Sequence, residues 1–163
     1  MAGEGGPGWR SIEGLAWLAR VGVAPVEPWR AAMGWAVFTA MSHARRLERA
    51  GLIARAARVR GDGGALLYAT VHGVDVARAR RGVRALALSK APAAVSWPHH
   101  EACADMAAYL TVRQRAMLAP RELLVDERWV GELEWREHDE TRRRGHRPDF
   151  VATAASANTM APA

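Results

Sequence analysis

The chain has 163 residues, half of them hydrophobic, which is enough for one ordinary domain or two small ones around a core. Its net charge of +6 at pH 7 favours a polyanionic partner. A single cysteine excludes an intrachain disulfide, and no apolar run approaches the roughly 20 residues of a membrane span. We therefore expect a soluble, cytoplasmic protein that does not contact membranes.

Two short helices are predicted at the start of the chain. Residues 11–20 carry apolar side chains at helical spacing, and Ser11 is the expected N-cap. Pro25 suits the first turn of a second helix, which buries Trp29 on its inner face. Gly34 can adopt the positive φ that ends this helix and begins a tight turn into the next one.

The third predicted helix has one apolar face and one polar, cationic face. Ala40, Ala44 and Leu47 recur at helical spacing and predict a buried stripe, which Val37 extends by one turn before and Ala50 by one turn after. Gly51 ends the helix. The other face carries groups suited to base edges, namely Thr39, Ser42, His43 and Arg46, with Arg45 and Arg49 beside them for phosphates. Such a face is typical of a helix that reads the major groove of DNA.

A β-hairpin is predicted directly after this helix. Residues 52–60 and 65–70 are rich in β-compatible side chains, and the glycine-rich run 61–64 between them needs a left-handed backbone. The first strand carries three arginines expected to touch phosphates or an adjacent minor groove, namely Arg55, Arg58 and Arg60. Between Met41 and Arg84 there are ten arginines and three acidic residues, a net charge of +7, which indicates contact with phosphates.

The remainder of the chain is predicted to be less regular. Thr70 can cap a fourth helix that runs to about Arg80. One further helix and three short strands are expected, at 100–113, 116–118, 123–125 and 146–152. We see no internal repeat.

The order of two helices, a turn, a third helix and a hairpin is that of a winged helix-turn-helix. Residues 44–53, ARRLERAGLI, resemble a stretch shared by many prokaryotic winged-helix proteins. Four shorter motifs follow, namely YATVHG at 68–73, HHE at 99–101, PREL at 120–123 and HRPD at 146–149. Together they resemble the replication-relaxation family of plasmids and integrative elements. This resemblance implies binding of double-stranded DNA in replication, transfer or transcription control, with replication or relaxation proteins as further partners.

The same resemblance raises a nuclease alternative, because the second half of that family looks like a PD-(D/E)xK core. Glu101, Glu122 and Asp149 would be its acidic residues. Such a site also needs an acid-x-lysine motif on the next strand, and the sequence after Asp149 has none. We therefore expect no catalysis and assign no catalytic residue, and a truncated or degenerate nuclease unit remains an alternative.

His99, His100 and Cys103 form the one candidate metal cluster, which His138 and His146 could complete. Structural zinc sites usually show tighter paired motifs, and a cysteine at an apolar helix position fits a core role. We therefore expect no metal and no other cofactor.

The predicted fold class is α+β. We expect a disordered lead at 1–10, a winged helix-turn-helix at 11–82, a linker at 83–95, a small partial α/β unit at 96–152, and a disordered tail at 153–163. The partial unit, which resembles a truncated PD-(D/E)xK fold, is expected to mediate assembly. A homodimer is expected because one recognition helix reads only a few base pairs. A scaffold used only for protein contacts is the third interpretation.

Overall fold

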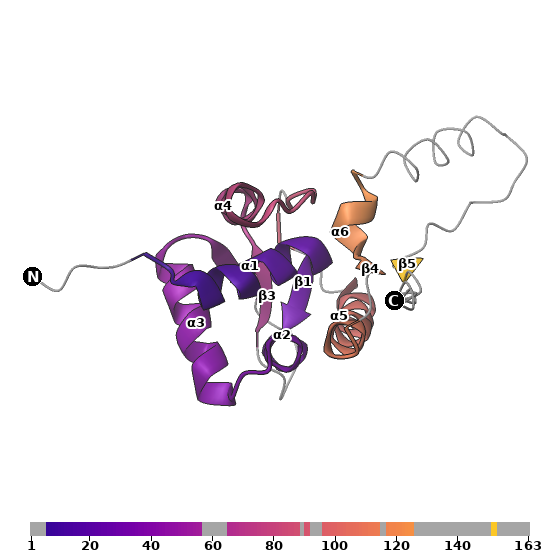
Figure 1. The fold of residues 1–163 in the computed structure, drawn as a ribbon, viewed down its shortest axis with the longest axis horizontal. Coiled ribbons are helices and arrows are strands. Elements are labelled where there is room, and N and C mark those ends of the chain that lie inside the picture. Colours follow the sequence, from indigo (N-terminus) through magenta and orange to yellow (C-terminus); the bar gives the residue numbers. More distant parts are fainter. Residues whose placement is uncertain are drawn as a thin grey trace, which may run out of the picture.

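The computed structural model describes residues 6–56, 65–88, 90–91, 96–114, 117–125 and 151–152 (Figure 1). The first part contains α1 (Trp9–Val21), β1 (Val23–Pro25), α2 (Val26–Met33), α3 (Val37–Arg49), β2 (Ile53–Ala56), β3 (Leu66–Ala69) and α4 (Val71–Arg81). The second part contains α5 (Trp97–Val112), β4 (Met117–Leu118), α6 (Pro120–Leu123) and β5 (Val151–Ala152). The protein is therefore a mixed structure of helices and small antiparallel sheets, in line with the predicted α+β class.

The main sheet has three antiparallel strands in the order β1-β3-β2. Val23 of β1 lies opposite Tyr68 of β3, and Ile53 of β2 lies opposite Ala69 of the same strand. The pairing of β2 with β3 confirms the predicted hairpin where the strands are described. Its tip, including Arg58 and Arg60, lies outside the described residues.

β1 was missed, because residues 23–25 were assigned to the start of the second helix. A strand of three residues is too short to show an alternating pattern, and pairing with β3 is what makes it a strand.

α1 is the central helix of the core and packs against α4, α3 and α6. Leu15 and Leu18 are fully buried on it, and the Trp29 indole Nε1–H of α2 donates to the Gly14 carbonyl at 2.9 Å. A Cβ on Gly14 would lie 2.6 Å from the ring of Trp35 and 2.8 Å from that of Trp29. The absence of a side chain at Gly14 therefore lets two indoles pack against the middle of α1.

Two further expectations about local structure were wrong. α1 begins at Trp9, so Ser11 lies buried inside the helix and is not its cap. The exposed side chains of the first turn leave no apolar pattern there, which is why the start was placed too late. Leu123, predicted to begin a strand, ends α6, because Pro120 opens a helical turn whose Glu122 side chain accepts the Ala119 N–H at 3.0 Å.

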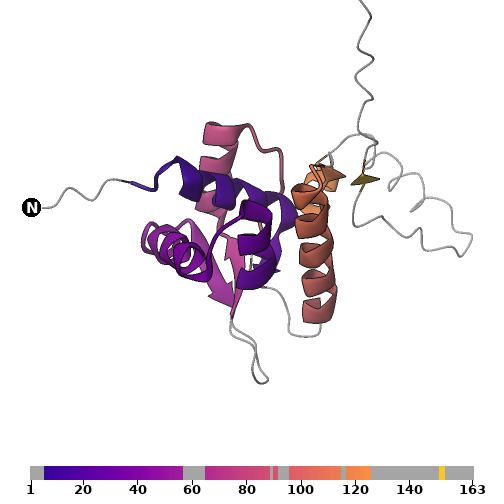
Figure 2. The ribbon, with the colours of Figure 1, turned by 60° about the horizontal axis from the view of Figure 1, so that its bottom comes forward.

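The same core extends across the segment expected to be a linker. Val83 and Ala85 are buried, and the Leu86 N–H donates to the Arg121 carbonyl at 3.1 Å. Ala104 and Ala107 of α5 belong to the cluster built around α1. The described residues on both sides of positions 83–95 thus share one core, and α5 lies on the side of the body away from α3 (Figures 1 and 2). Among the described helices, none has the length and apolar character needed to cross a membrane.

Candidate nucleic-acid interface

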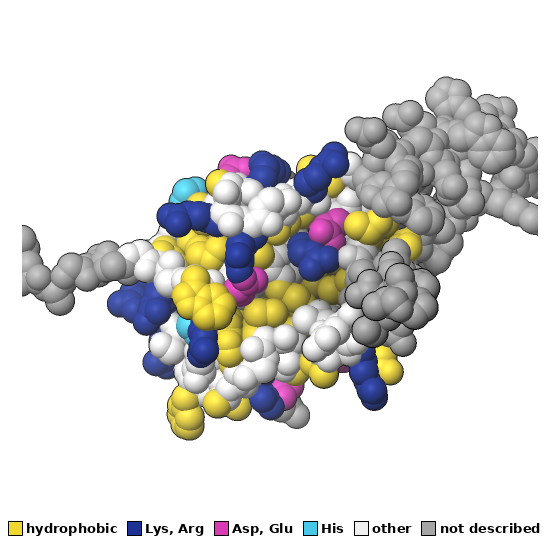
Figure 3. Space-filling model, viewed as in Figure 1, with side chains coloured by type: hydrophobic (Ala, Val, Ile, Leu, Met, Phe, Trp, Pro, Cys, Tyr) yellow, Lys and Arg dark blue, Asp and Glu magenta, His cyan; other side chains and the backbone are white. Residues whose placement is uncertain are grey.

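The outward face of α3 carries the candidate interface. Ala40, Ala44 and Leu47 are buried, as predicted, and hold the helix against the core. Five of the predicted DNA-contacting side chains are exposed on the other side, namely Thr39, Ser42, Arg45, Arg46 and Arg49. Some Lys and Arg side chains lie at the left edge of Figure 3, where α3 lies, and others are spread over the rest of that face. The predicted stripe was too long, because Val37 is 51% exposed and Ala50 is exposed as well. Both lie at the ends of the helix, beyond the part that packs on the core.

His43 lies apart from that exposed group. Its Nδ1 is 2.8 Å from the Ser11 hydroxyl of α1, and its ring centroid is 4.3 Å from that of Trp35. Burial lowers the pKa of His43 below its ordinary value, and the charges of Arg46 and Arg10 lower it further. The neutral form of the imidazole is therefore favoured. The ring lies against α1 and Trp35, whereas the sequence pattern predicts it among the base-reading residues.

Arg55, predicted to contact the DNA backbone, is on β2 next to an acidic side chain of α3. Its guanidinium Nη2 donates to Glu48 Oε2 at 2.8 Å, and its Nε contacts the other carboxylate oxygen. The pair ties the end of α3 to the first strand of the hairpin. It also offsets the positive charge of Arg55 at this point of the surface.

One exposed residue on α3 was missed by the sequence reasoning. Phe38 is 89% exposed, and it lies one turn before Ser42 on the outward face. The spacing of four residues between them was the available signal. Phe38 was not considered when the two faces of the helix were assigned.

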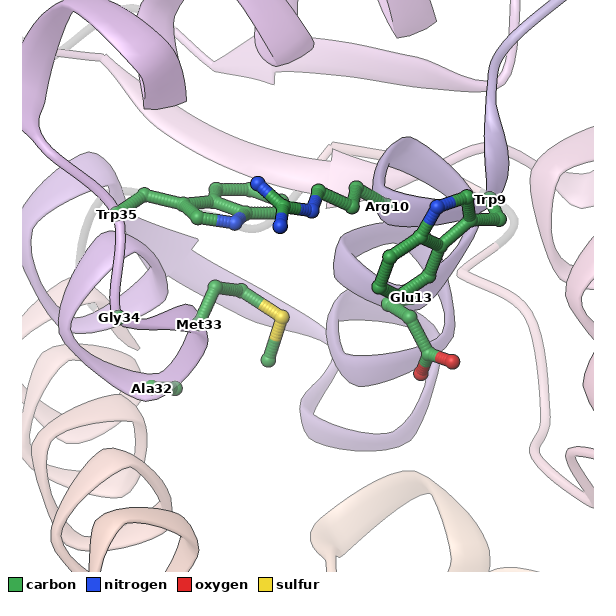
Figure 4. A pocket seen from close by; sticks show the side chains of 7 residues that line it. All are labelled: Trp9, Arg10, Glu13, Ala32, Met33, Gly34 and Trp35. Carbon is green, nitrogen blue, oxygen red and sulfur yellow. The ribbon is translucent and has the colours of Figure 1, made fainter.

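A cleft of about 360 Å³ lies beside α3, between the first turn of α1 and the turn that joins α2 to α3 (Figure 4). Its lining includes Trp9, Arg10, Glu13, Met33 and Trp35. The Arg10 guanidinium is 5.4 Å from the centre of the Trp9 ring, and the Arg10 side chain extends from α1 toward Trp35 in Figure 4. Trp35 thus lines the cleft and also packs against His43, and Arg10 places a positive charge in the same cleft.

The candidate metal cluster is only partly described. Cys103 Sγ lies 3.6 Å from His99 Nε2, and both residues are on α5. Within the described ranges, no group of three His, Cys, Asp or Glu side chains could hold a metal ion. His138 and His146 lie outside those ranges.

Two of the three candidate nuclease acids lie in the part of the chain that the structure describes. Glu122 Oε1 lies 2.9 Å from Arg20 Nε, and the other oxygen accepts the Ala119 N–H, so this carboxylate ties α6 to α1. Glu101 is half-buried on α5. Asp149 lies outside the described residues.

Comparison with known proteins finds no matching family model, no curated relative and no similar solved structure. The resemblance to the replication-relaxation family stays a prediction, and the geometry of α3 and its neighbours carries the functional inference.

Proposed function

We propose that residues 9–82 form a winged helix-turn-helix that binds double-stranded DNA with α3 in the major groove. The order α1, β1, α2, α3, β2, β3, α4 supports this proposal, because a helix-turn-helix followed by a hairpin is what the fold requires. Gly34 supports it as well, since a φ of 64° places it in the left-handed conformation at the turn between α2 and α3.

The observation that carries the proposal is the exposed, cationic face of α3. A helix of 13 residues that presents three arginines and two hydroxyl side chains to solvent offers donors for both base edges and phosphates. Thr39, Ser42 and Arg46 are the proposed base-reading residues. Arg45 and Arg49 are the proposed phosphate contacts.

The hairpin supplies the second part of the proposed interface. Arg55, Arg58 and Arg60 would contact the backbone or an adjacent minor groove, Arg55 after exchanging its contact with Glu48 for a phosphate. By the resemblance of its motifs, the protein would act in the replication, transfer or transcription control of a plasmid or another mobile element. Replication or relaxation proteins would be its partners, and it would carry out no catalysis.

The salt dependence of duplex binding tests the proposal. Affinity for a duplex selected from a random pool should fall steeply with salt, with a log-log slope of about −0.9 for each phosphate contacted. Arg46→Ala should weaken binding to the selected duplex by about 1–3 kcal/mol and relax its sequence preference. Arg45→Ala should weaken binding to all duplexes alike and reduce the slope.

The matched control is Lys90→Ala, which removes an exposed positive charge outside the arginine-rich stretch 41–84. It should leave both affinity and slope close to those of the unchanged protein. A flat salt dependence, or equal losses for Arg46→Ala and Lys90→Ala, would refute DNA binding through α3.

A further inference from the structure

α5 carries large apolar side chains on its exposed face as well as a buried apolar face. Cys103, Ala104, Ala107 and Ala108 are buried, and α5 contacts α2 and β1. A surface helix with one such face ordinarily carries polar and charged side chains on the other. α5 departs from that rule.

The exposed side of α5 presents an apolar stripe at helical spacing. Met106 is 51% exposed, Tyr109 58% and Val112 60%. Two charged side chains flank this stripe, Asp105 before it and Arg113 directly after the helix, and both are exposed. The Arg113 guanidinium lies 5.5 Å from the centre of the Tyr109 ring, so it lies along the stripe. Single exposed hydrophobic residues are ordinary, but three in a row on one helix face mark a contact surface.

The stripe has opposite charges at equal distances on either side of Tyr109, so it complements a second copy of itself that runs in the opposite direction. Asp105 lies four residues before Tyr109 and Arg113 four residues after it, so each is about 6 Å from it along the helix axis. In an antiparallel pair of α5 helices centred on Tyr109, Asp105 of each copy lies level with Arg113 of the other. Met106 and Val112, three residues either side of Tyr109, likewise lie level with one another.

We propose that this α5 stripe is the interface of a homodimer in which two copies pack α5 antiparallel about a two-fold axis at Tyr109. The charges favour a second copy of this chain as the partner. When two copies of the stripe pack together, Asp105 of each copy can pair with Arg113 of the other. The buried centre is an aromatic pair, and aromatic side chains are enriched at the centres of interfaces.

The position of α5 is compatible with the function proposed for α3. The two helices lie on opposite sides of the body in both ribbon views (Figures 1 and 2). A dimer joined through α5 leaves both copies of α3 uncovered. The dimer itself does not depend on DNA binding, so the two proposals can fail separately.

Sedimentation velocity of the full chain without DNA tests the dimer. A single pair of helices buries a small interface, so we expect a dissociation constant on the order of 10 µM. The protein should therefore change from mostly monomer to mostly dimer between about 1 and 200 µM. Tyr109→Glu should raise this constant by about tenfold or more, because it places a carboxylate at the centre of the apolar contact. Val71→Glu is the control, since Val71 is 56% exposed on α4, outside the stripe. Circular dichroism confirms that both variants are folded.

A charge exchange tests the register of the two helices. Asp105→Arg should weaken the dimer by opposing two arginines, and the double variant Asp105→Arg with Arg113→Asp should restore it. The proposal is overturned if the protein without substitutions stays monomeric over the whole concentration range. That result is expected if residues 126–150 of the same chain cover the stripe. Equal effects of Tyr109→Glu and Val71→Glu, or no recovery in the double variant, would overturn it too.

Discussion

Gly73 on α4 offers a sharp test of how the helices are packed. A Cβ at this position would lie 1.9 Å from the carbonyl oxygen of Leu52 and 3.2 Å from a methyl carbon of Leu15. In Gly73→Ala, α4 therefore has to move by roughly 1 Å or more away from the residue that precedes β2. That movement strains a hydrogen bond in which the Thr70 N–H donates to the same carbonyl at 3.0 Å.

Opposing effects determine how much Gly73→Ala changes the free energy of unfolding. Alanine is favoured over glycine inside a helix by about 1 kcal/mol. Overpacking against a backbone atom costs about 1–3 kcal/mol, and weakening the Thr70 hydrogen bond costs about 1 kcal/mol more. We therefore expect Gly73→Ala to lower the free energy of unfolding by about 1–3 kcal/mol, although helix propensity alone predicts the opposite sign.

Thermal unfolding followed by circular dichroism measures the effect. At 2–4 °C per kcal/mol for a chain of this size, the melting temperature of Gly73→Ala should fall by about 2–12 °C. Gly6→Ala is the control, because Gly6 precedes α1, a Cβ there meets nothing within 4 Å, and its φ lies outside the left-handed region. A Gly73→Ala protein as stable as the unchanged one would show that α4 does not approach Leu52 this closely.

Two further predictions concern charged groups near α3. Because burial and the charges of Arg46 and Arg10 lower the folded-state pKa of His43 from 6.5, the unfolded chain binds this proton more readily. The resulting stability is present above about pH 6.5 and is lost as the pH falls through the folded-state pKa. His43→Gln should therefore reduce the loss of unfolding free energy between about pH 7.5 and 5.5 in urea titrations, and an unchanged pH dependence would contradict this. Glu48→Gln should release Arg55, leave stability within about 1 kcal/mol, and increase duplex affinity with a salt slope steeper by about 0.9. A fluorescence anisotropy titration in which the variant binds no more tightly would show that Arg55 does not reach the duplex.

The sequence by itself determined the centre of the buried face of α3 and the order of the helices and the hairpin around it. Ala40, Ala44 and Leu47 mark the buried side through their spacing, and arginine occupies the side that remains. Gly34 and Gly51 mark the turns because both have a positive φ in the structure, which side chains oppose. These features are local, so the periodicity of one helix and the conformational freedom of single glycines are sufficient to predict them.

Tertiary contacts decided what could not be predicted locally. β1 is a strand only because β3 lies beside it, and Ser11 and His43 are 32 residues apart in the chain but hydrogen-bonded in the fold. The imidazole of His43 has the same polar character whether it faces solvent or α1, so helix periodicity cannot choose between the two. That choice depends on where α1 and Trp35 pack, which is a property of the whole core.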